Sequence, residues 1–521
     1  MAYNPTEWKD EVVQHPRRIR LTPVMGESDV YDYDREKGTI TEEGTPVTAA
    51  NLNNVEQGLE THLADIATEE QLGHIKVGEN LTIDGDGTLN AQGGVDYNIT
   101  DVDPTAEDDT TKGYEVGSRW INEADEMEYI CVSNAENEAV WRGTTENRRA
   151  GFTIVGLEWN QGTDSYQRLD DAENLTVGAS VGGQAIQSDF DNIFPYSEMK
   201  RCNLSDAGVV NAYYGDPLYI EDGSNGQVMV EIPKFWYKSE KVDSIYRWWI
   251  ANTETIGYNV HPAFIRNGVE KDKIYISAYE GNVSSNIMRS IANAKPSTDE
   301  NVSDGTIGGF RGYAQARGTN WEMQDFLTTS AIQLLYLIEF ATFDTQTTIG
   351  RGVVDKTSGS GNESNNTGAT SFLGNASGRQ SGTDGLTSIS CRGIENFWGN
   401  IWKFIDGLNL SDYEAFIADH DFESDKFTDN YSSVGSVLST SDTFIKDIVF
   451  NGLDFGFLAS EGGGSSSTYL HDNWWVNTGQ RVGRFGGNWT IDSRAGGFCW
   501  YLHADSATAT RDYGARLAFY G

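Results

Sequence analysis

The chain has 521 residues, a formal net charge of −40 at pH 7, and 57 Gly against 10 Pro. Because this length exceeds what one hydrophobic core usually serves, we expect two or more domains, turn-rich and mostly β. The negative charge, which no basic patch offsets, argues against nucleic-acid binding and against binding to an anionic lipid surface.

No targeting or membrane segment is predicted. The first ten residues lack the basic and apolar regions of a signal peptide, so we expect the chain to fold in the cytoplasm where it is made. The most apolar run, Ala331 to Phe343, is broken by Gln333 and Glu339 and is shorter than the ~20 residues that cross a bilayer. The cysteines form no C-x-x-C pair, so we expect free thiols and no disulfide framework, zinc site or cofactor: Cys131, Cys202, Cys391 and Cys499.

The first predicted element is a helix that follows Val47, with Thr48 as its N-cap. Its apolar positions follow the 3-4-3-4 spacing of a coiled-coil seam. A short coiled coil between subunits and an amphipathic helix packed on its own domain both fit this pattern. The seam residues are Leu52, Val55, Leu59, His62 and Ile66.

An acidic stretch after the helix imitates the start of a calcium loop at Asp84, Asp86 and Thr88. A calcium loop has Gly at its sixth position and Glu at its twelfth, but Leu89 and Val95 occupy these positions here. We therefore predict a β-turn between two short strands and no metal site.

Three further elements are predicted downstream. A small β-module should contain strands near 117–122 and 129–132. A helix is expected from Thr328 to Phe343, with Leu334, Leu335, Ile338 and Thr342 on one face. The polar insertion at 352–388, rich in Gly, Ser, Asn and Thr, is typical of a mobile surface loop.

Several motifs together resemble a known class of proteins. Arg484 to Trp489, followed by Gly514 to Phe519, resembles the C-terminal variable region of phage tropism determinants that retroelements diversify. Gly399 to Gly407 is similar to the core motif of the C-type-lectin-like fold, also found in formylglycine-generating enzymes. Gly38 to Pro46, leading into Ala49 to Asn53, is similar to the openings of phage tail and baseplate proteins.

The resemblance implies a mostly β chain with an α+β C-terminal domain of the C-type-lectin-like, formylglycine-generating-enzyme-like class. An N-terminal anchor with a short helix and small β-modules would precede it. The expected domains are an anchor and oligomerisation helix at 1–70, a β linker at 71–95, a β-module at 96–146, and a receptor-binding domain at 147–521 with a variable region at about 484–521.

The genetic code provides a check on the resemblance. Retroelements of this class mutate template adenines, and a randomised AAY codon cannot encode Lys, Glu, Gln, Met or Trp. From Arg481 to the end, the chain contains no Lys, Glu, Gln or Met. Trp489 and Trp500 would then belong to a fixed scaffold, together with Gly486, Gly487 and Arg516.

The resemblance implies a virion protein of the phage tail tip, made in the host cytoplasm, that binds a glycan or protein receptor on the host cell. The expected partners are two further copies in a homotrimer and other tail or baseplate proteins. Aromatic rings mixed with short hydrogen-bonding side chains suit such a surface. The candidate receptor-binding residues, all expected to be exposed, are Thr490, Ile491, Asp492, Ser493, Arg494, Tyr501, His503, Asp505, Ser506, Arg511, Asp512 and Tyr513. Trp474 and Trp475 are candidates for stacking on a sugar, with core packing open for one of them.

Other readings stay open beside this one. A glycan hydrolase needs two positioned carboxylates, and among 78 acidic residues the sequence singles out no pair, so we expect no enzyme activity and no catalytic residues. A pairing of Cys391 with Cys499 in catalysis is disfavoured, because Cys499 lies in the variable stretch. The acidic run from Asp419 to Asp425 is read as a solvated loop, with a divalent cation as the alternative. A purely structural spacer would explain the N-terminal half only.

Overall fold

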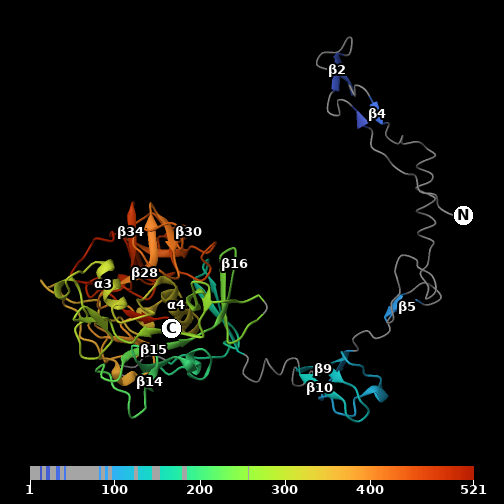
Figure 1. The fold of residues 1–521 in the computed structure, drawn as a ribbon, viewed down its shortest axis with the longest axis horizontal. Helices are drawn as coiled ribbons and strands as arrows, with labels where there is room; N and C mark the ends of the chain where they lie inside the picture. The colour runs from blue at the N-terminus through green and yellow to red at the C-terminus, as the bar shows by residue number, and fades with distance from the viewer. Residues whose placement is uncertain are drawn as a thin grey trace. The chain divides into compact units, whose positions relative to one another are not determined.

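The computed structural model describes residues 97–122, 127–143, 153–178, 185–255 and 257–521, together with short strands nearer the N-terminus. The chain divides into two compact units, Met1–Asn147 and Arg148–Gly521 (Figure 1). The described part is mostly β with few helices, as the composition predicted.

The first unit begins with three antiparallel strand pairs. The pair β5–β6 matches the two short strands predicted on either side of Asp84 to Thr88. The turn between them and the predicted helix after Val47, with its seam, lie outside the described residues. The pairs are β1 (Val12–Val13) with β4 (Ile40–Glu42), β2 (Ile19–Pro23) with β3 (Tyr31–Arg35), and β5 (Leu81–Ile83) with β6 (Leu89–Ala91).

The small β-module is a four-stranded sheet in the order β10-β9-β8-β7. Its core is aromatic: buried Trp120 lies 5.7 Å from the ring centroid of Trp141 and 5.7 Å from that of Tyr114. Both predicted strand segments are present. Its elements are β7 (Tyr97–Thr100), η1 (Thr110–Lys112), β8 (Arg119–Asn122), β9 (Met127–Ser133) and β10 (Val140–Gly143).

Two sheets form one part of the second unit. The first has the order β12 (Ser165–Asp170), β11 (Ile154–Asn160), β17 (Ile245–Ala251), β16 (Trp236–Val242) and β18 (Asn259–Val260). The second has the order β14 (Val210–Tyr213), β13 (Lys200–Leu204), β15 (Gln227–Pro233), β21 (Lys273–Ser277), β37 (Leu517–Phe519) and β24 (Trp321–Met323). The C-terminal strand β37 is therefore an interior strand, paired on both sides.

A nine-stranded sheet carries the C-terminal motifs, and β28, β30 and β34 label it in Figure 1. Its path is β30 (Ser432–Ser436), β29 (Glu414–Ile417), β28 (Trp402–Ser411), β34 (Gln480–Phe485), β35 (Trp500–Leu502), β33 (Asn473–Val476), β31 (Thr443–Ile448) and β32 (Ala459–Gly462), with β36 (Tyr513–Gly514) beside β28. Small ladders complete the strands: β19 (Ile265–Arg266) with β20 (Val269–Glu270), β22 (Asn282–Ser284) with β23 (Ile287–Arg289), and β25 (Gly378–Arg379) with β26 (Ile389–Cys391) and β27 (Ile394–Glu395).

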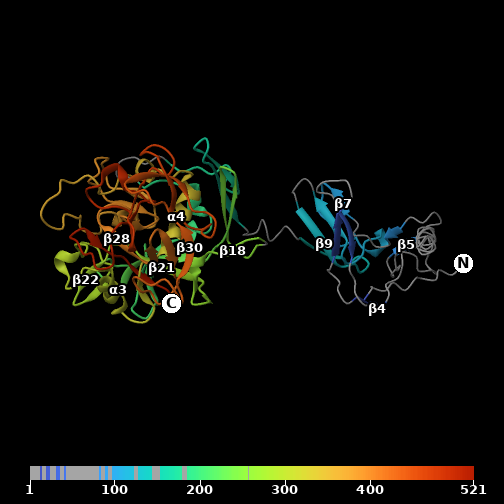
Figure 2. The ribbon, with the colours of Figure 1, turned by 90° about the horizontal axis from the view of Figure 1, so that it is seen from above.

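Helix α4 (Phe326–Phe340) lies in the interior of the second unit, where Figures 1 and 2 both place its label. It starts at the N-cap Asp325, whose side chain accepts the Thr328 amide, and ends at Ala341 in the left-handed conformation. The prediction of a helix here is confirmed, but the prediction of one apolar face is wrong. Every residue of α4 is buried, as expected of a helix that packs on all sides, and Thr342 lies beyond its end.

The remaining helices are short. Within the described residues, none is long and apolar enough to span a bilayer. They are α3 (Ile307–Gln315) and α5 (Thr345–Thr348), with single 3-10 turns η2 (Asp189–Asn192), η3 (Tyr196–Glu198), η4 (Pro262–Phe264), η5 (Asp299–Asn301), η6 (Ser371–Leu373) and η7 (Asp492–Arg494).

Candidate receptor-binding surface

Strand pairing decides which aromatic side chains of the C-terminal segment face outward. Strands β33 and β35 run parallel, with Trp474 opposite Trp500 and Trp475 opposite Tyr501. Because successive side chains of a strand point to opposite faces, one pair enters the core and the other faces out. Trp474 and Trp500 are fully buried, whereas Trp475 and Tyr501 are half-buried.

The outward rings form a small surface, here called the aromatic shelf and defined as Trp475, Tyr501 and His503. The Tyr501 ring lies 6.0 Å from Trp475 and 5.7 Å from His503, centroid to centroid. Buried Trp402 of β28 supports the shelf, 5.2 Å from Tyr501 and 5.8 Å from Trp475. Rings fixed in this way lose little conformational entropy when they bind a ligand.

A buried arginine supports the shelf from below. The Arg484 guanidinium lies 4.3 Å from the ring centroid of Tyr513 and 4.8 Å from that of Phe404. It also donates to the carbonyl oxygens of Ala504 (3.3 Å) and Asp505 (3.1 Å). Burial lowers the pKa of Arg484, but an arginine keeps its charge, and rings and carbonyls provide its compensation. The turn after His503 is thereby tied to the sheet.

Tyr513 corrects one expectation. It is 6 % exposed and packs on Arg484 and Phe404. With Phe404 and Trp402 it belongs to a second hydrophobic cluster, so it is part of the buried layer, here called the frame, rather than of the exposed surface. The physical reason is the parallel pairing of β36 with β28, which sets Tyr513 opposite Trp402. Only the tertiary structure brings these two segments together.

Glycines with left-handed backbone begin the loop that leads to the exposed residues. Gly486 (φ 86°) and Gly487 (φ 87°) follow β34, and a Cβ on Gly486 would lie 2.9 Å from the Phe397 carbonyl oxygen. Such conformations favour glycine. Trp489, the next large residue, is buried against Val353 and Ile401, which fits its assignment to a scaffold.

Four of the polar candidates bond to neighbouring side chains at two places near these glycines. Asp512 accepts a hydrogen bond from buried Asn488, whose side-chain oxygen accepts the Thr490 amide at 2.9 Å. The Ser506 hydroxyl bonds Asp425, and Asp505 accepts from Thr508. These side chains bond to neighbours in the frame, and their conformations are preset.

The 3-10 turn η7 links the shelf to a neighbouring cleft. The Arg494 guanidinium lies 5.4 Å from the Trp475 ring centroid and 3.5 Å from Asp442. Asp492 pairs with Arg351, while the Ser493 side chain is exposed. Ile491 packs on Gly487 and on the second hydrophobic cluster.

Arg511 contacts the polar insertion at 352–388. It donates to the Ser358 hydroxyl (2.8 Å) and to the Gly361 carbonyl oxygen (3.3 Å). The prediction that this insertion is a mobile surface loop is wrong for its central part, where Thr367, Thr370 and Ser377 are buried. The hydroxyl groups of Thr367 and Thr370 donate to the Ile291 carbonyl oxygen and to the Glu395 carboxylate.

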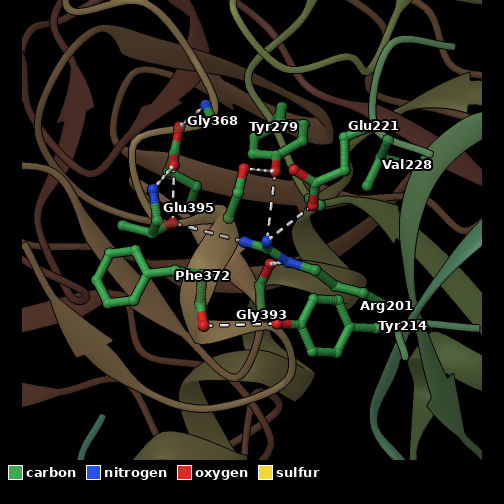
Figure 3. Close-up of polar contacts among 12 residues, drawn as sticks. Arg201, Tyr214, Glu221, Val228, Tyr279, Gly368, Phe372, Gly393 and Glu395 are labelled. Carbon is green, nitrogen blue, oxygen red and sulfur yellow. Dashed lines mark hydrogen bonds and ion pairs between the residues drawn. The ribbon is translucent and has the colours of Figure 1, made fainter. Parts of the chain in front are cut away.

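Figure 3 shows the hydrogen-bond network that holds the central part of the insertion. The carboxylate of fully buried Glu395 accepts the amides of Gly368 (2.8 Å) and Thr370 (2.7 Å). Arg201 lies beside it and donates to the Gly393 carbonyl oxygen (2.7 Å) and to Tyr279 (3.3 Å). Because a buried carboxylate needs such donors, the insertion and the frame stabilise each other.

The structure therefore separates the twelve candidates into three groups. Tyr513 is buried. Ile491, Arg494, Tyr501, Ser506, Arg511 and Asp512 are half-buried, and Thr490, Asp492, Ser493, His503 and Asp505 are exposed. Sequence reasoning missed Trp402 as support and Arg351 as the partner of Asp492. Trp402 lies within the Gly399 to Gly407 motif, which was a signal for it, but nothing in the sequence pointed to Arg351.

Comparison with known proteins adds similarity to one group of solved structures. No family model matches the chain, and no curated protein matches it. The chain is similar to solved variants of the Major Tropism Determinant. For the U1 variant the identity is 11 %, with 82 % of this chain and 99 % of that chain covered and a TM-score of 0.24. For the M1 variant the identity is 13 %, with 82 % of this chain and 98 % of that chain covered and a TM-score of 0.25. For the P3c variant the identity is 12 %, with 82 % and 99 % of the two chains covered and a TM-score of 0.22. Scores this far below 0.5 establish no common fold, so the function rests on the site itself.

The structure also describes the residues on which the alternative functions, an enzyme or a cation site, would depend. Cys391 and Cys499 are buried free thiols, and burial raises the pKa of both. In the acidic run, Asp419 accepts the Asn267 amide at 2.9 Å and contacts His420. Across the described ranges, no three His, Cys, Asp or Glu side chains are grouped as a metal site would need.

Proposed function

We propose that the chain is a phage tail-tip protein that binds a receptor on the host-cell surface through the aromatic shelf and the exposed residues around it. The single observation that supports this most strongly is the layering of the site. Half-exposed Trp475 and Tyr501 stand on buried Trp402 and Arg484, so the outer side chains contribute area to a ligand while the inner ones maintain the fold. Tyr, Trp and Arg are the usual anchors of binding surfaces.

The finer parts of the proposal come from the sequence. We propose a C-type-lectin-like domain at 147–521 with a variable region at about 484–521, diversified by a retroelement. We also propose a tail anchor at 1–70, a linker at 71–95, a β-module at 96–146, and a homotrimer joined through the helix after Val47. Replacement of exposed residues is compatible with a conserved frame, because surface substitutions rarely cost much stability.

Cell attachment tests the receptor-binding proposal. The labelled chain is incubated with a panel of bacterial strains, and the Tyr501→Ala/His503→Ala variant is compared with a Thr163→Ala control, whose exposed hydroxyl lies on a turn of another sheet. We expect the shelf variant to lose attachment and the control to keep it. Equal attachment by both would mean that the receptor site lies elsewhere.

Two further measurements separate the rival classes. Binding of the chain to a glycan array distinguishes a receptor-binding protein from a spacer, and release of sugars from wall polysaccharide would reveal a hydrolase. Light scattering tests the trimer, since a species of about 57.5 kDa at micromolar concentration would be a monomer.

A further inference from the structure

A polar cleft of about 370 Å³ opens beside the candidate receptor surface. It lies between α5, the Gly350 to Arg351 loop, the end of β25 and the segment that includes His471. Ser493 of the candidate receptor surface also lines it. The cleft therefore adjoins the shelf through η7, whose Arg494 contacts Trp475.

Arg379 is the unusual group in this cleft. Its side chain is only 9 % exposed, and its Nη1 donates to the Ile349 carbonyl oxygen at 3.1 Å. Its buried Nε has no hydrogen-bond partner, and among the described residues no carboxylate lies within ion-pair distance of its guanidinium. Buried charges are normally paired, so this arginine has an unused capacity to bind an anion.

The backbone is shaped to admit the Arg379 stem. Gly350 has φ +153°, and a Cβ at this position would lie 2.9 Å from Arg379 Cδ. The absence of that Cβ lets the Arg379 stem lie against Gly350, and both residues line the cleft.

The acidic groups of the cleft are committed to internal contacts. Asp344 caps α5 by accepting the Thr347 amide at 2.9 Å, and its other oxygen lies 3.5 Å from His471 Nδ1. Asp472 accepts the Phe498 amide at 2.6 Å, and burial raises its pKa well above the ordinary range. Both carboxylates are therefore engaged by protein groups, whereas no carboxylate among the described residues lies within ion-pair distance of the Arg379 guanidinium.

The rest of the lining supplies hydroxyl groups. Thr347, Ser466 and Ser493 line the cleft, and each hydroxyl can both donate and accept a hydrogen bond, as the hydroxyls of a sugar do. The chain carries a net charge of −40, so an anion approaching it is repelled unless local cations compensate. Arg379, which no carboxylate among the described residues neutralises, gives the cleft such a local cation.

We propose that this cleft binds the anionic group of an acidic saccharide, a carboxylate or a phosphate, with Arg379 as its ionic partner and the surrounding hydroxyls contacting the sugar. The inference rests on the proposed function, because it identifies the chemical class of the receptor. Arginine suits both anions, since its planar guanidinium donates two parallel hydrogen bonds.

Calorimetric titration of the full chain tests the proposal with three probes: oligogalacturonate, oligo(glycerol phosphate) and the neutral maltohexaose. We expect one of the two anionic probes to bind, maltohexaose to bind more weakly, and affinity to fall as salt rises. Binding of the first identifies a carboxylate receptor and binding of the second a phosphate receptor. No binding by either anionic probe would overturn the proposal.

Arg379→Gln should weaken binding of the active probe at least tenfold. Arg289→Gln is the matched control, because Arg289 lies outside the cleft and also has an Nε without a partner, yet it bonds to Asn282. A thermal melt of each variant reports folding. Equal affinity of Arg379→Gln and the unchanged chain would overturn the proposal.

A second variant avoids the buried position. Ser493→Glu adds a negative charge at an exposed position of the cleft wall, so it should weaken anion binding several-fold without altering the melt. Cell attachment separates the two proposals. If Arg379→Gln and Ser493→Glu attach normally while Tyr501→Ala does not, the acidic-saccharide inference fails and the proposed function stands; if Tyr501→Ala also attaches normally, the proposed function fails.

Discussion

Two aromatic clusters of this chain have similar residues and different roles. In the β-module, the indole N–H groups of Trp120 and Trp141 donate to the carbonyl oxygens of Val102 (2.7 Å) and Asp108 (2.9 Å). In the second unit, Trp475 and Tyr501 lie on a layer that is already packed. The comparison teaches that an aromatic ring is available for binding only where other residues already form the core beneath it.

The largest loss of stability is expected in the β-module, where no second layer of side chains supports the aromatic core. Trp120→Ala should unfold the β-module, because the loss of a buried tryptophan costs about 3–5 kcal/mol and a domain this small has little stability to spare. Alkylation of Cys131, which is 1 % exposed, measures the opening. The melt of the second unit should not change, and a protected Cys131 in this variant would contradict the expectation.

The next largest loss of stability is expected when Arg484, below the aromatic shelf, is replaced. Arg484→Met removes the cation that lies over the Tyr513 ring and its hydrogen bonds to the Ala504 and Asp505 carbonyl oxygens, although the Ala504 oxygen keeps the Val482 amide as a donor. We expect a loss of about 2–3 kcal/mol, because hydrogen bonds from a charged group contribute about 1.5–3 kcal/mol and the lost cation–π contact adds to this. Denaturant unfolding of the second unit measures it. If Arg484→Met lost less free energy of unfolding than Tyr501→Ala, the outer ring rather than the buried arginine would stabilise this region.

Strand β28, which carries Trp402, also contains a buried amine that should make stability depend on pH. Burial lowers the pKa of Lys403 to about 7, although Glu280 lies 3.3 Å away. Between that value and the ordinary lysine pKa, the unfolded chain binds a proton that the folded chain does not, so this group makes stability rise with pH above about 7.

Lys403→Met/Glu280→Gln should flatten that rise. The double variant is preferred because Lys403→Met alone leaves the Glu280 carboxylate buried without its cation. Unfolding at pH 7, 8 and 9 gives the slopes, and parallel slopes for the two proteins would show that Lys403 titrates normally.

In the shelf itself, Tyr501→Ala should cost stability only modestly. Its ring contacts with Trp402 and His503 are worth about 0.5–1.5 kcal/mol each at most, while attachment should fall about thirtyfold if Tyr501 acts as an anchor. A paired thermal melt and attachment assay separates the two effects. A melt lowered as far as that of Arg484→Met would place Tyr501 in the core.

The smallest effect on stability is expected at Arg494. Its ion pair with Asp442 is long, at 3.5 Å, and both side chains are well exposed, so Arg494→Ala should change stability by less than about 0.5 kcal/mol. Attachment should still weaken, because the guanidinium lies over the outward Trp475 ring. Unchanged attachment would restrict the receptor surface to Tyr501 and His503.

Local patterns predicted much of the secondary structure. The strands of the β-module and the apolar run that becomes α4 follow from residue type and spacing. The environment of α4 did not follow, because a run read as one apolar face is buried on every side. The polar insertion was also misinterpreted, because its Gly and Ser content signals loops in general. Its central part is held by Glu395, which follows it in the chain, and by Arg201, which is distant in sequence.

By itself the sequence determined the strands of the β-module and the helix over the apolar run before Phe343, because side-chain period and residue propensity are local properties of the chain. Only the tertiary structure decided that Tyr513 is buried, that Arg511 contacts Ser358 and that Arg379 pairs with no carboxylate in the described part of the chain. Each of these depends on segments that meet through sheet pairing or loop packing. A residue's own neighbours in sequence carry no information about which distant segment will cover it.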